Sequence, residues 1–263
     1  MAAMDFSDED LDSLSRAKAI LENPGLAIRL ASLVGKPFDQ VLHFLPGAAR
    51  GIISQATDAA IRQCLKAALG TLGGKGEGRR PRNDLHKFAV GLTGAVGGAF
   101  GLGALAIELP ITTTLMFRSI CEIARSEGEN LEDADVRLQC LTVLALGGPT
   151  AADDDAETGY FAVRAALAEM VSLSVSELAA KGLGAPTSSA LLRLVNRVAE
   201  RFSTKVAQQV AAKSIPVVGA VLGATINTAF MEHFQGMAQA HFTIRRLERR
   251  YGPAAVEVAY GVL

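Results

Sequence analysis

The chain has 263 residues, which is enough for one large domain or two small ones. Its formal net charge is −1, so no overall field favours binding to nucleic acid or to an anionic membrane. With no Trp and only three Tyr, the sequence also offers few aromatic rings for stacking on bases, and we expect no nucleic-acid partner.

Residues 1–72 are predicted to form an N-terminal helical region. A first helix begins at Ser7 or Asp8, either of which can cap it, and it ends at Pro24 and Gly25. A short helix follows over 26–34, and a longer one runs from about residue 48 to 72. Strand signals are nearly absent along the whole sequence, so we predict an all-α fold.

A glycine-rich, basic segment follows at residues 73–84, with the sequence GGKGEGRRPRND. Its glycines give the backbone freedom, and its like charges oppose packing, so we predict a flexible linker. Contact of its basic residues with phosphate or lipid is the alternative interpretation. On this division, residues 85–263 form the main helical domain.

Two charge-free segments, 88–107 and 215–231, carry glycines at helical spacing. Gly97 and Gly101 share one helix face, as do Gly219 and Gly223. Each glycine costs a helix about 1 kcal/mol relative to alanine, a cost that close packing against another helix offsets. We therefore predict a single multi-helix bundle in which these two segments pack against each other at the centre.

Each glycine stripe leads to a polar residue, Glu108 in the first segment and Asn227 in the second. A buried carboxylate needs a partner or a raised pKa, and we expect Arg118 and Arg245 on flanking helices to be partners. The four residues form a candidate polar site for binding or proton handling. The alternative is a helix-end cap and a structural hydrogen bond beside Pro110, where we expect a new or kinked helix to begin.

The rest of the chain is also predicted to be helical. Asn130 is expected to cap a helix that stops at residues 147–149, and the acidic stretch 152–159 lacks the spacing of a calcium loop. The further predicted helices cover 156–181, 188–213 and 217–250, the last bent or broken near Gly236, and a short helix follows Gly252 and Pro253.

The length of the first charge-free segment raises the question of a membrane. Twenty residues reach about 30 Å as a helix, enough to span a bilayer. Only eight of the twenty are Phe, Val, Leu or Ile, however, and eleven are Gly or Ala, which is a weak insertion signal. A buried core, a shallow helical hairpin in the membrane and a true span all stay open.

No catalytic motif is recognisable in the sequence. The four histidines do not form H-E-x-x-H, and there is no G-x-S-x-G or Walker loop. The three cysteines, Cys64, Cys121 and Cys140, are far apart and contain no Cys-x-x-Cys, so we expect reduced, buried thiols. We predict no catalytic residue, no metal site and no cofactor. Since the first residues, MAAMDFSDEDLDSL, do not resemble a secretory signal, we expect a cytoplasmic protein.

Three blocks of sequence carry a resemblance to a known family. They are GGAFGLGALAIELPITTTLMFRSICEIARSEGENL, the ALGG that precedes an acidic loop and GYFAVR, and IPVVGAVLGATIN with a helix ending in RRLERRYG. Over residues 85–252 these blocks resemble the EcsC family of bacterial proteins. The acidic position before the proline is often Asp in relatives and is Glu108 here.

The resemblance implies a role but no reaction. The family takes its name from a protein encoded beside an ABC transporter linked to secretion and protein processing. It thus implies a non-enzymatic, helical accessory protein with a membrane surface or a membrane protein as its partner, peripheral or shallowly inserted at the inner face of the cell membrane. The alternatives are a peptidase-like hydrolase with its site around Glu108, Arg118 and Asn227, and a soluble scaffold that binds partner helices.

Overall fold

The computed structural model describes residues 6–22, 25–35, 49–70, 102–147, 156–181, 189–215 and 220–263. These residues form helices and contain no strand, which confirms the all-α fold class. The helices are α1 (Asp8–Glu22), α2 (Leu26–Val34), α4 (Ala49–Leu69), α6 (Leu102–Ser126), α7 (Ala134–Thr142), the 3-10 turn η1 (Val143–Ala145), α8 (Ala156–Lys181), α9 (Ser189–Lys213), α10 (Ala220–Tyr251) and α11 (Pro253–Val262).

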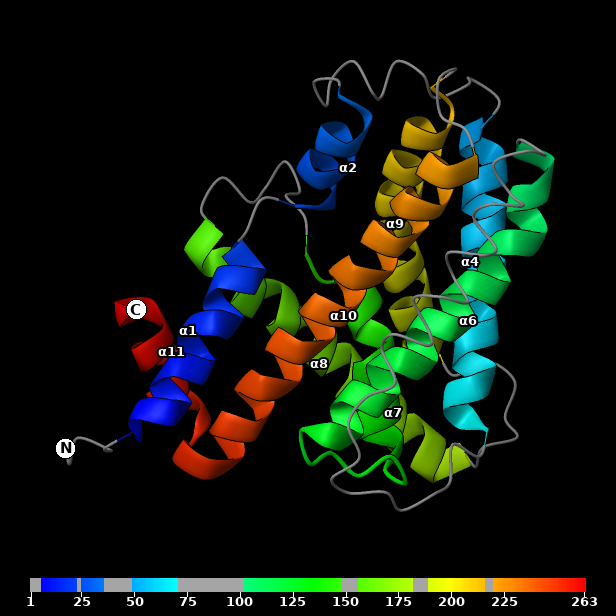
Figure 1. The fold of residues 1–263 in the computed structure, drawn as a ribbon. Coiled ribbons are helices and arrows are strands. Elements are labelled where there is room, and N and C mark those ends of the chain that lie inside the picture. Colours follow the sequence, from blue (N-terminus) through cyan, green and yellow to red (C-terminus); the bar gives the residue numbers. More distant parts are fainter. Residues whose placement is uncertain are drawn as a thin grey trace.

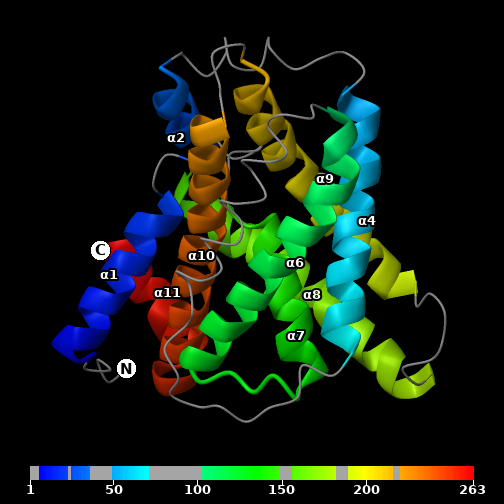
Figure 2. The same ribbon diagram turned by 45° about the vertical axis from the view of Figure 1, so that its right-hand side comes forward.

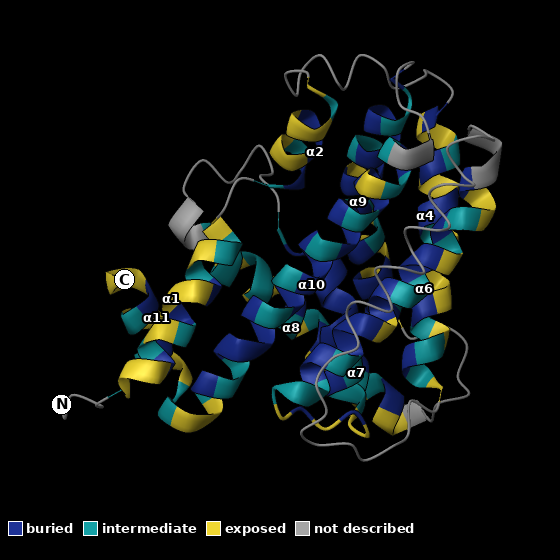
Figure 3. Ribbon diagram, viewed as in Figure 1, coloured by how far each residue is buried: buried dark blue, intermediate teal, exposed yellow. Residues whose placement is uncertain are grey.

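The longest helix, α10, organises the bundle. Helices α1, α2, α6, α9 and α11 all contact it, while α4 packs against α6 and α9 on the far side (Figures 1 and 2). The buried residues concentrate where α9 and α10 meet, and the outer sides of α1, α2 and α11 face solvent (Figure 3). The core has a main part between α2, α4, α6, α7, α8, α9 and α10, and a smaller part between α1, the second half of α10 and α11.

Local sequence accounts for several helix ends. The Ser7 side chain accepts a hydrogen bond from the backbone N–H of Asp10 at 3.2 Å, so Ser7 is the cap of α1. Gly35 ends α2 in the left-handed conformation, with φ of 64°. Pro253 occupies the first turn of α11, where its missing N–H costs nothing. Asn130 does not cap α7, which begins after Asp133; its side chain accepts from the Glu132 N–H instead.

A new helix does not begin at Pro110, and the alternative, a kink at this position, stays a prediction. Helix α6 begins at Leu102 and continues through the proline, which leaves only the carbonyl one turn earlier without its usual donor. The threonines that follow donate to backbone carbonyls within the same helix, Thr112 to Glu108 at 3.0 Å and Thr114 to Pro110 at 2.7 Å. Proline does favour a helix break at this position, but the packing of α6 against helices on both of its sides outweighs that preference.

The expected break near Gly236 is also absent, since α10 is one helix from Ala220 to Tyr251. A β-carbon built on Gly236 would lie 3.4 Å from Ile20 Cγ2 of α1. The glycine therefore admits a close crossing of α1 over α10.

The glycine stripes fall mostly outside the described residues, as does the predicted linker at 73–84. Gly223 is buried within α10, but Gly97, Gly101 and Gly219 are not described. Helices α6 and α10, into which the two stripes run, do pack against each other. The facing of the two stripes stays a prediction. No helix in the described part of the chain has the length and hydropathy to span a bilayer.

The three cysteines are free and buried, as expected. They come from α4, α6 and α7, and burial raises the pKa of the Cys64 thiol above its ordinary value. Such thiols are poor nucleophiles, since the reactive thiolate is scarce.

Candidate functional site

Three polar side chains of α9 lie on its buried side. Lys205, Gln209 and Lys213 are spaced by four residues, so they follow one another along one helix face. Lys205 is 5% exposed and Gln209 is 6% exposed, in a stretch otherwise filled by Val206 and Val210. This row meets polar groups of α10 and α6.

Glu108 and Asn227 do come together, as the sequence predicted. Glu108 Oε1 accepts hydrogen bonds from Lys213 Nζ at 2.8 Å and from Asn227 Nδ2 at 3.0 Å. Asn227, which is fully buried, accepts in turn from Gln209 Nε2 at 2.6 Å. We call these four residues the Glu108 cluster; it ties α6, α9 and α10 to one another.

The expected arginine partners lie elsewhere. Arg118 is exposed on the outer side of α6, and Arg245 forms ion pairs with Glu129 and Asp135. Sequence reasoning instead missed Lys213 and Gln209. Lys213 is the last residue of α9, a position where lysine is ordinarily explained by the helix dipole alone.

Deeper along the same interface, Lys205 faces His233 without an opposite charge. No hydrogen bond or ion pair of Lys205 occurs within the described residues, and burial together with the charge of Arg201 lowers the pKa of Lys205 to about 7. Burial and the charges of Lys205 and Arg29 lower the pKa of His233 to about 3. The His233 ring is therefore neutral, and its Nε2 has no partner in the described structure.

The second half of α10 holds a separate ionic network around four arginines. Glu129, whose side chain is 5% exposed, accepts from Arg245 Nε at 2.8 Å and also from Arg249. Arg246 reaches both Glu127 and the buried Asp10 of α1, and Arg250 pairs with Asp10 at 2.8 Å. Because these arginines are matched by carboxylates, the network fixes the α6–α7 connection and α1 onto α10.

Tyr160 and Arg164 of α8 join the same half of α10. The Tyr160 hydroxyl lies 3.0 Å from His241 Nδ1, and Arg164 forms a two-pronged ion pair with Glu248. Burial and the charges of Arg164 and Arg245 lower the pKa of His241 well below its ordinary value, so His241 is neutral, and its tautomer decides which of the two groups donates.

These arrangements favour positioning over catalysis. In the Glu108 cluster the carboxylate already accepts from two donors, and its neighbours are an amide and an ammonium. Within the described residues, no three His, Cys, Asp or Glu side chains are placed to hold a metal ion. Two pockets, of about 320 Å³ between α2 and α10 and about 230 Å³ between α8 and α9, are lined by other residues.

Exposed aliphatic side chains occur at the end of the bundle where α6 and α10 begin. The two charge-free segments of the sequence run into these two helices. The starts of α6 and α10 and the end of α2 lie at this end of the bundle, with α2 and α6 on opposite sides of α10 (Figures 1 and 2). Ile107 and Ile111, one turn apart on α6, are 71% and 46% exposed, and Ile28 and Leu33 of α2 are 55% and 36% exposed. We call this region, defined by these four residues, the aliphatic end.

The sequence model of the EcsC protein family matches residues 9–247. The chain therefore belongs to the EcsC protein family, and the match takes in the N-terminal helices that the three sequence blocks left out. No curated protein and no solved structure matches the chain.

Proposed function

We propose that this protein is a non-enzymatic accessory protein that docks on a membrane surface with its aliphatic end. The observation that carries the proposal is the coincidence of exposed Ile107 and Ile111 with the start of α6, directly after the charge-free glycine-rich segment. Exposed aliphatic residues are ordinary when scattered, but several at the same end of a molecule, with Ile107 and Ile111 one turn apart on α6, favour an interaction surface there.

The size of the effect suits reversible binding. Burying one leucine or isoleucine side chain contributes roughly 1.5–3 kcal/mol, so a few such side chains give a peripheral contact. The sequences 88–101 and 216–219, which precede α6 and α10 in the chain, contain no charge that burial in an interface would desolvate.

The hydrolase alternative has less support. Glu108 is engaged by Lys213 and Asn227, and neither of the two pockets described above includes it. The polar core thus supports the bundle that carries the aliphatic end, which is the part an accessory protein would present to its partner.

Co-flotation with liposomes tests the proposal. We expect the wild-type protein to float with phosphatidylcholine vesicles and the double variant Ile107→Glu/Ile111→Glu to stay in the dense fractions. Val258→Glu is the matched control, because Val258 is 69% exposed on α11, away from this end. Equal flotation of both variants, or no flotation of the wild type with any lipid, would overturn lipid docking; recovery only with native membranes would point to a membrane protein instead.

A further inference from the structure

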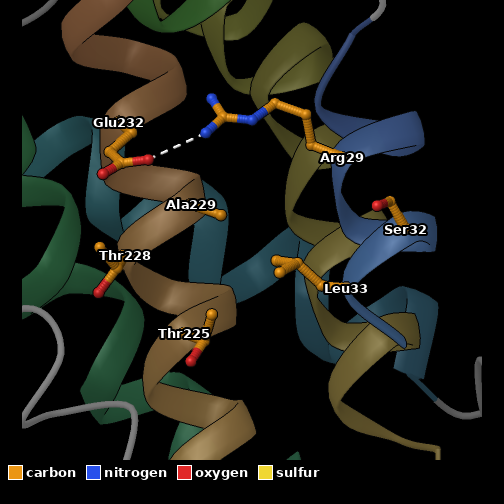
Figure 4. Close-up of a pocket in the computed structure, with 7 residues that line it drawn as sticks. All are labelled: Arg29, Ser32, Leu33, Thr225, Thr228, Ala229 and Glu232. Atoms are coloured by element: carbon orange, nitrogen blue, oxygen red, sulfur yellow. Dashed lines mark hydrogen bonds and ion pairs between the residues drawn. The ribbon is translucent and has the colours of Figure 1, made fainter. Parts of the chain in front are cut away.

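The pocket of about 320 Å³ between α2 and α10 lies at the aliphatic end and is lined by both polar and apolar groups. Figure 4 shows the lining residues Arg29, Ser32 and Leu33 of α2 and Thr225, Thr228, Ala229 and Glu232 of α10, with Arg29 and Leu33 reaching toward α10. Its volume is in the range of small-ligand sites. A surface gap with this lining is suited to an amphiphile.

The charges of the pocket are one cation and one anion, placed side by side. Arg29 Nη2 donates to Glu232 Oε2 at 2.9 Å, and the two side chains are 46% and 37% exposed. Surface ion pairs of this exposure contribute little to stability, so a ligand that offers each charge a new partner can replace the pair. The planar fork of arginine suits a phosphate, whereas the carboxylate suits an ammonium with N–H donors.

The apolar side of the pocket opens toward the aliphatic end. Arg29 and Glu232 lie at one end of the pocket, and Leu33 projects toward α10 one turn farther along α2 (Figure 4). Ala229 is buried at the floor, and the Thr228 hydroxyl donates to the Ala224 carbonyl, which leaves its oxygen free to accept. A headgroup at Arg29 and Glu232 would thus direct its chains past Leu33 to the membrane side.

We propose that this pocket binds the headgroup of a phospholipid that carries a phosphate and a primary ammonium, as in phosphatidylethanolamine. Arg29 binds the phosphate, and Glu232 accepts from the ammonium, so a contact of each charge with the lipid replaces the Arg29–Glu232 ion pair. The inference deepens the proposed function, on which it rests for the source of the lipid.

The pocket chemistry discriminates between common headgroups. An anionic headgroup without an ammonium is attracted by Arg29, but the carboxylate of Glu232 repels it. A choline headgroup has no N–H to donate, and quaternary ammonium groups are usually bound by aromatic cages, whereas none of the lining residues is aromatic.

Titration calorimetry with dihexanoyl lipids, kept as monomers, tests the pocket alone. We expect phosphatidylethanolamine to bind about fivefold or more tighter than phosphatidylcholine and phosphatidylglycerol. Glu232→Gln should bring the ethanolamine and choline lipids to equal affinity, and Arg29→Gln should weaken both. The matched control is Arg62→Gln/Asp58→Asn, which removes an ion pair of similar exposure on α4. Equal affinities for the three lipids in the wild type would overturn the inference, as would free O-phosphoethanolamine binding as tightly as its lipid.

Flotation of the same variants separates this inference from the proposed function. Glu232→Gln should still float with pure phosphatidylcholine vesicles and lose only the increment gained by adding phosphatidylethanolamine. If the monomeric lipid binds but no vesicle is floated, membrane docking fails and the pocket assignment stands. If vesicles are floated without any dependence on the ethanolamine headgroup, docking stands and the pocket assignment fails.

Discussion

Glu108 Oε1 accepts a hydrogen bond from Asn227 Nδ2 at 3.0 Å, across 119 positions of sequence. The bond joins α6 to α10, from the residue that follows the first charge-free segment to a residue within the second. Lys213 supplies the compensating charge, so the buried carboxylate is an ion pair with an added amide donor. The polar contacts of Glu108 thus join three different helices, α6, α9 and α10, beside the aliphatic end.

Replacing Asn227 tests this lock. Asn227→Leu should lower the free energy of unfolding by about 2–3 kcal/mol, because Gln209 loses its acceptor in a buried place and Glu108 loses a donor. Urea denaturation monitored by circular dichroism would measure it. Thr228→Ala, next along α10, is the control; its hydroxyl bonds only within its own helix, and it should cost well under half as much. A leucine variant as stable as the wild type would show that the amide is dispensable.

The sequence was sufficient for the helices and for the meeting of Glu108 with Asn227, because periodicity and glycine spacing report which helix face is buried. It was not sufficient to predict which charged side chains would pair with Glu108. Which cation meets Glu108 depends on the rotation of α9 against α10, and that follows from packing of the whole core. Arg245 was predicted as a partner because its actual partners, Glu129 and Asp135, could not be identified from the sequence. Both lie in or after the turn that follows α6, and helical periodicity does not predict where such a turn is placed.

The three blocks that carry the family resemblance converge on α10. Glu129, from the first block, pairs with Arg245 from the third, and Arg164 from the second pairs with Glu248. Much of what the blocks encode is therefore the mutual attachment of α6, α8 and α10.

The ionic network around Glu129 should make a measurable contribution to stability. Glu129→Gln keeps the shape but leaves Arg249 without a charge partner and Arg245 with only the more distant Asp135, in a partly buried place, and we expect a loss of about 3 kcal/mol. Glu200→Gln, which breaks an exposed pair with Arg197, should change stability by less than about 0.5 kcal/mol.

The Glu129→Gln variant should also change how the free energy of unfolding depends on pH. Burial alone would raise the pKa of Glu129, but the hydrogen bonds and charges of Arg245 and Arg249 outweigh it and hold the pKa below its ordinary value. The stabilisation is therefore present above the unfolded pKa and is lost as pH falls through the folded one. The wild type and Glu129→Gln should converge in denaturation experiments at acidic pH; a gap that persists there would mean that packing, not charge, is responsible.

Gly147 should be intolerant of any side chain. Its φ is 71°, and a β-carbon there would lie 2.6 Å from Met237 Sδ and 3.1 Å from the His233 ring. Gly147→Ala should cost about 2–3 kcal/mol, from backbone strain and from displacement of both neighbours. Gly35→Ala is the control, since its φ is 64° with open space around the β-carbon, and it should cost about 1 kcal/mol from strain alone. Equal losses in thermal or urea unfolding would deny the close contact with His233.

Lys205 should be a residue that weakens the fold at neutral pH. Burial and the charge of Arg201 lower its pKa to about 7, against an ordinary value of 10.5. Between these two values the unfolded chain binds a proton that the folded chain does not, so stability rises with pH across this window. The penalty is complete below pH 7 and disappears above the unfolded pKa.

Lys205→Met removes the amine and keeps most of the volume. We expect a gain of roughly 2–4 kcal/mol at neutral and lower pH that shrinks toward zero at about pH 10, measured by urea denaturation across this range. His233 gives an independent readout, because the charge of Lys205 is one cause of its low pKa. NMR titration should show the His233 pKa raised in Lys205→Met. A variant less stable than the wild type, with the His233 pKa unmoved, would mean that the ammonium has a stabilising partner and that the two groups do not face each other.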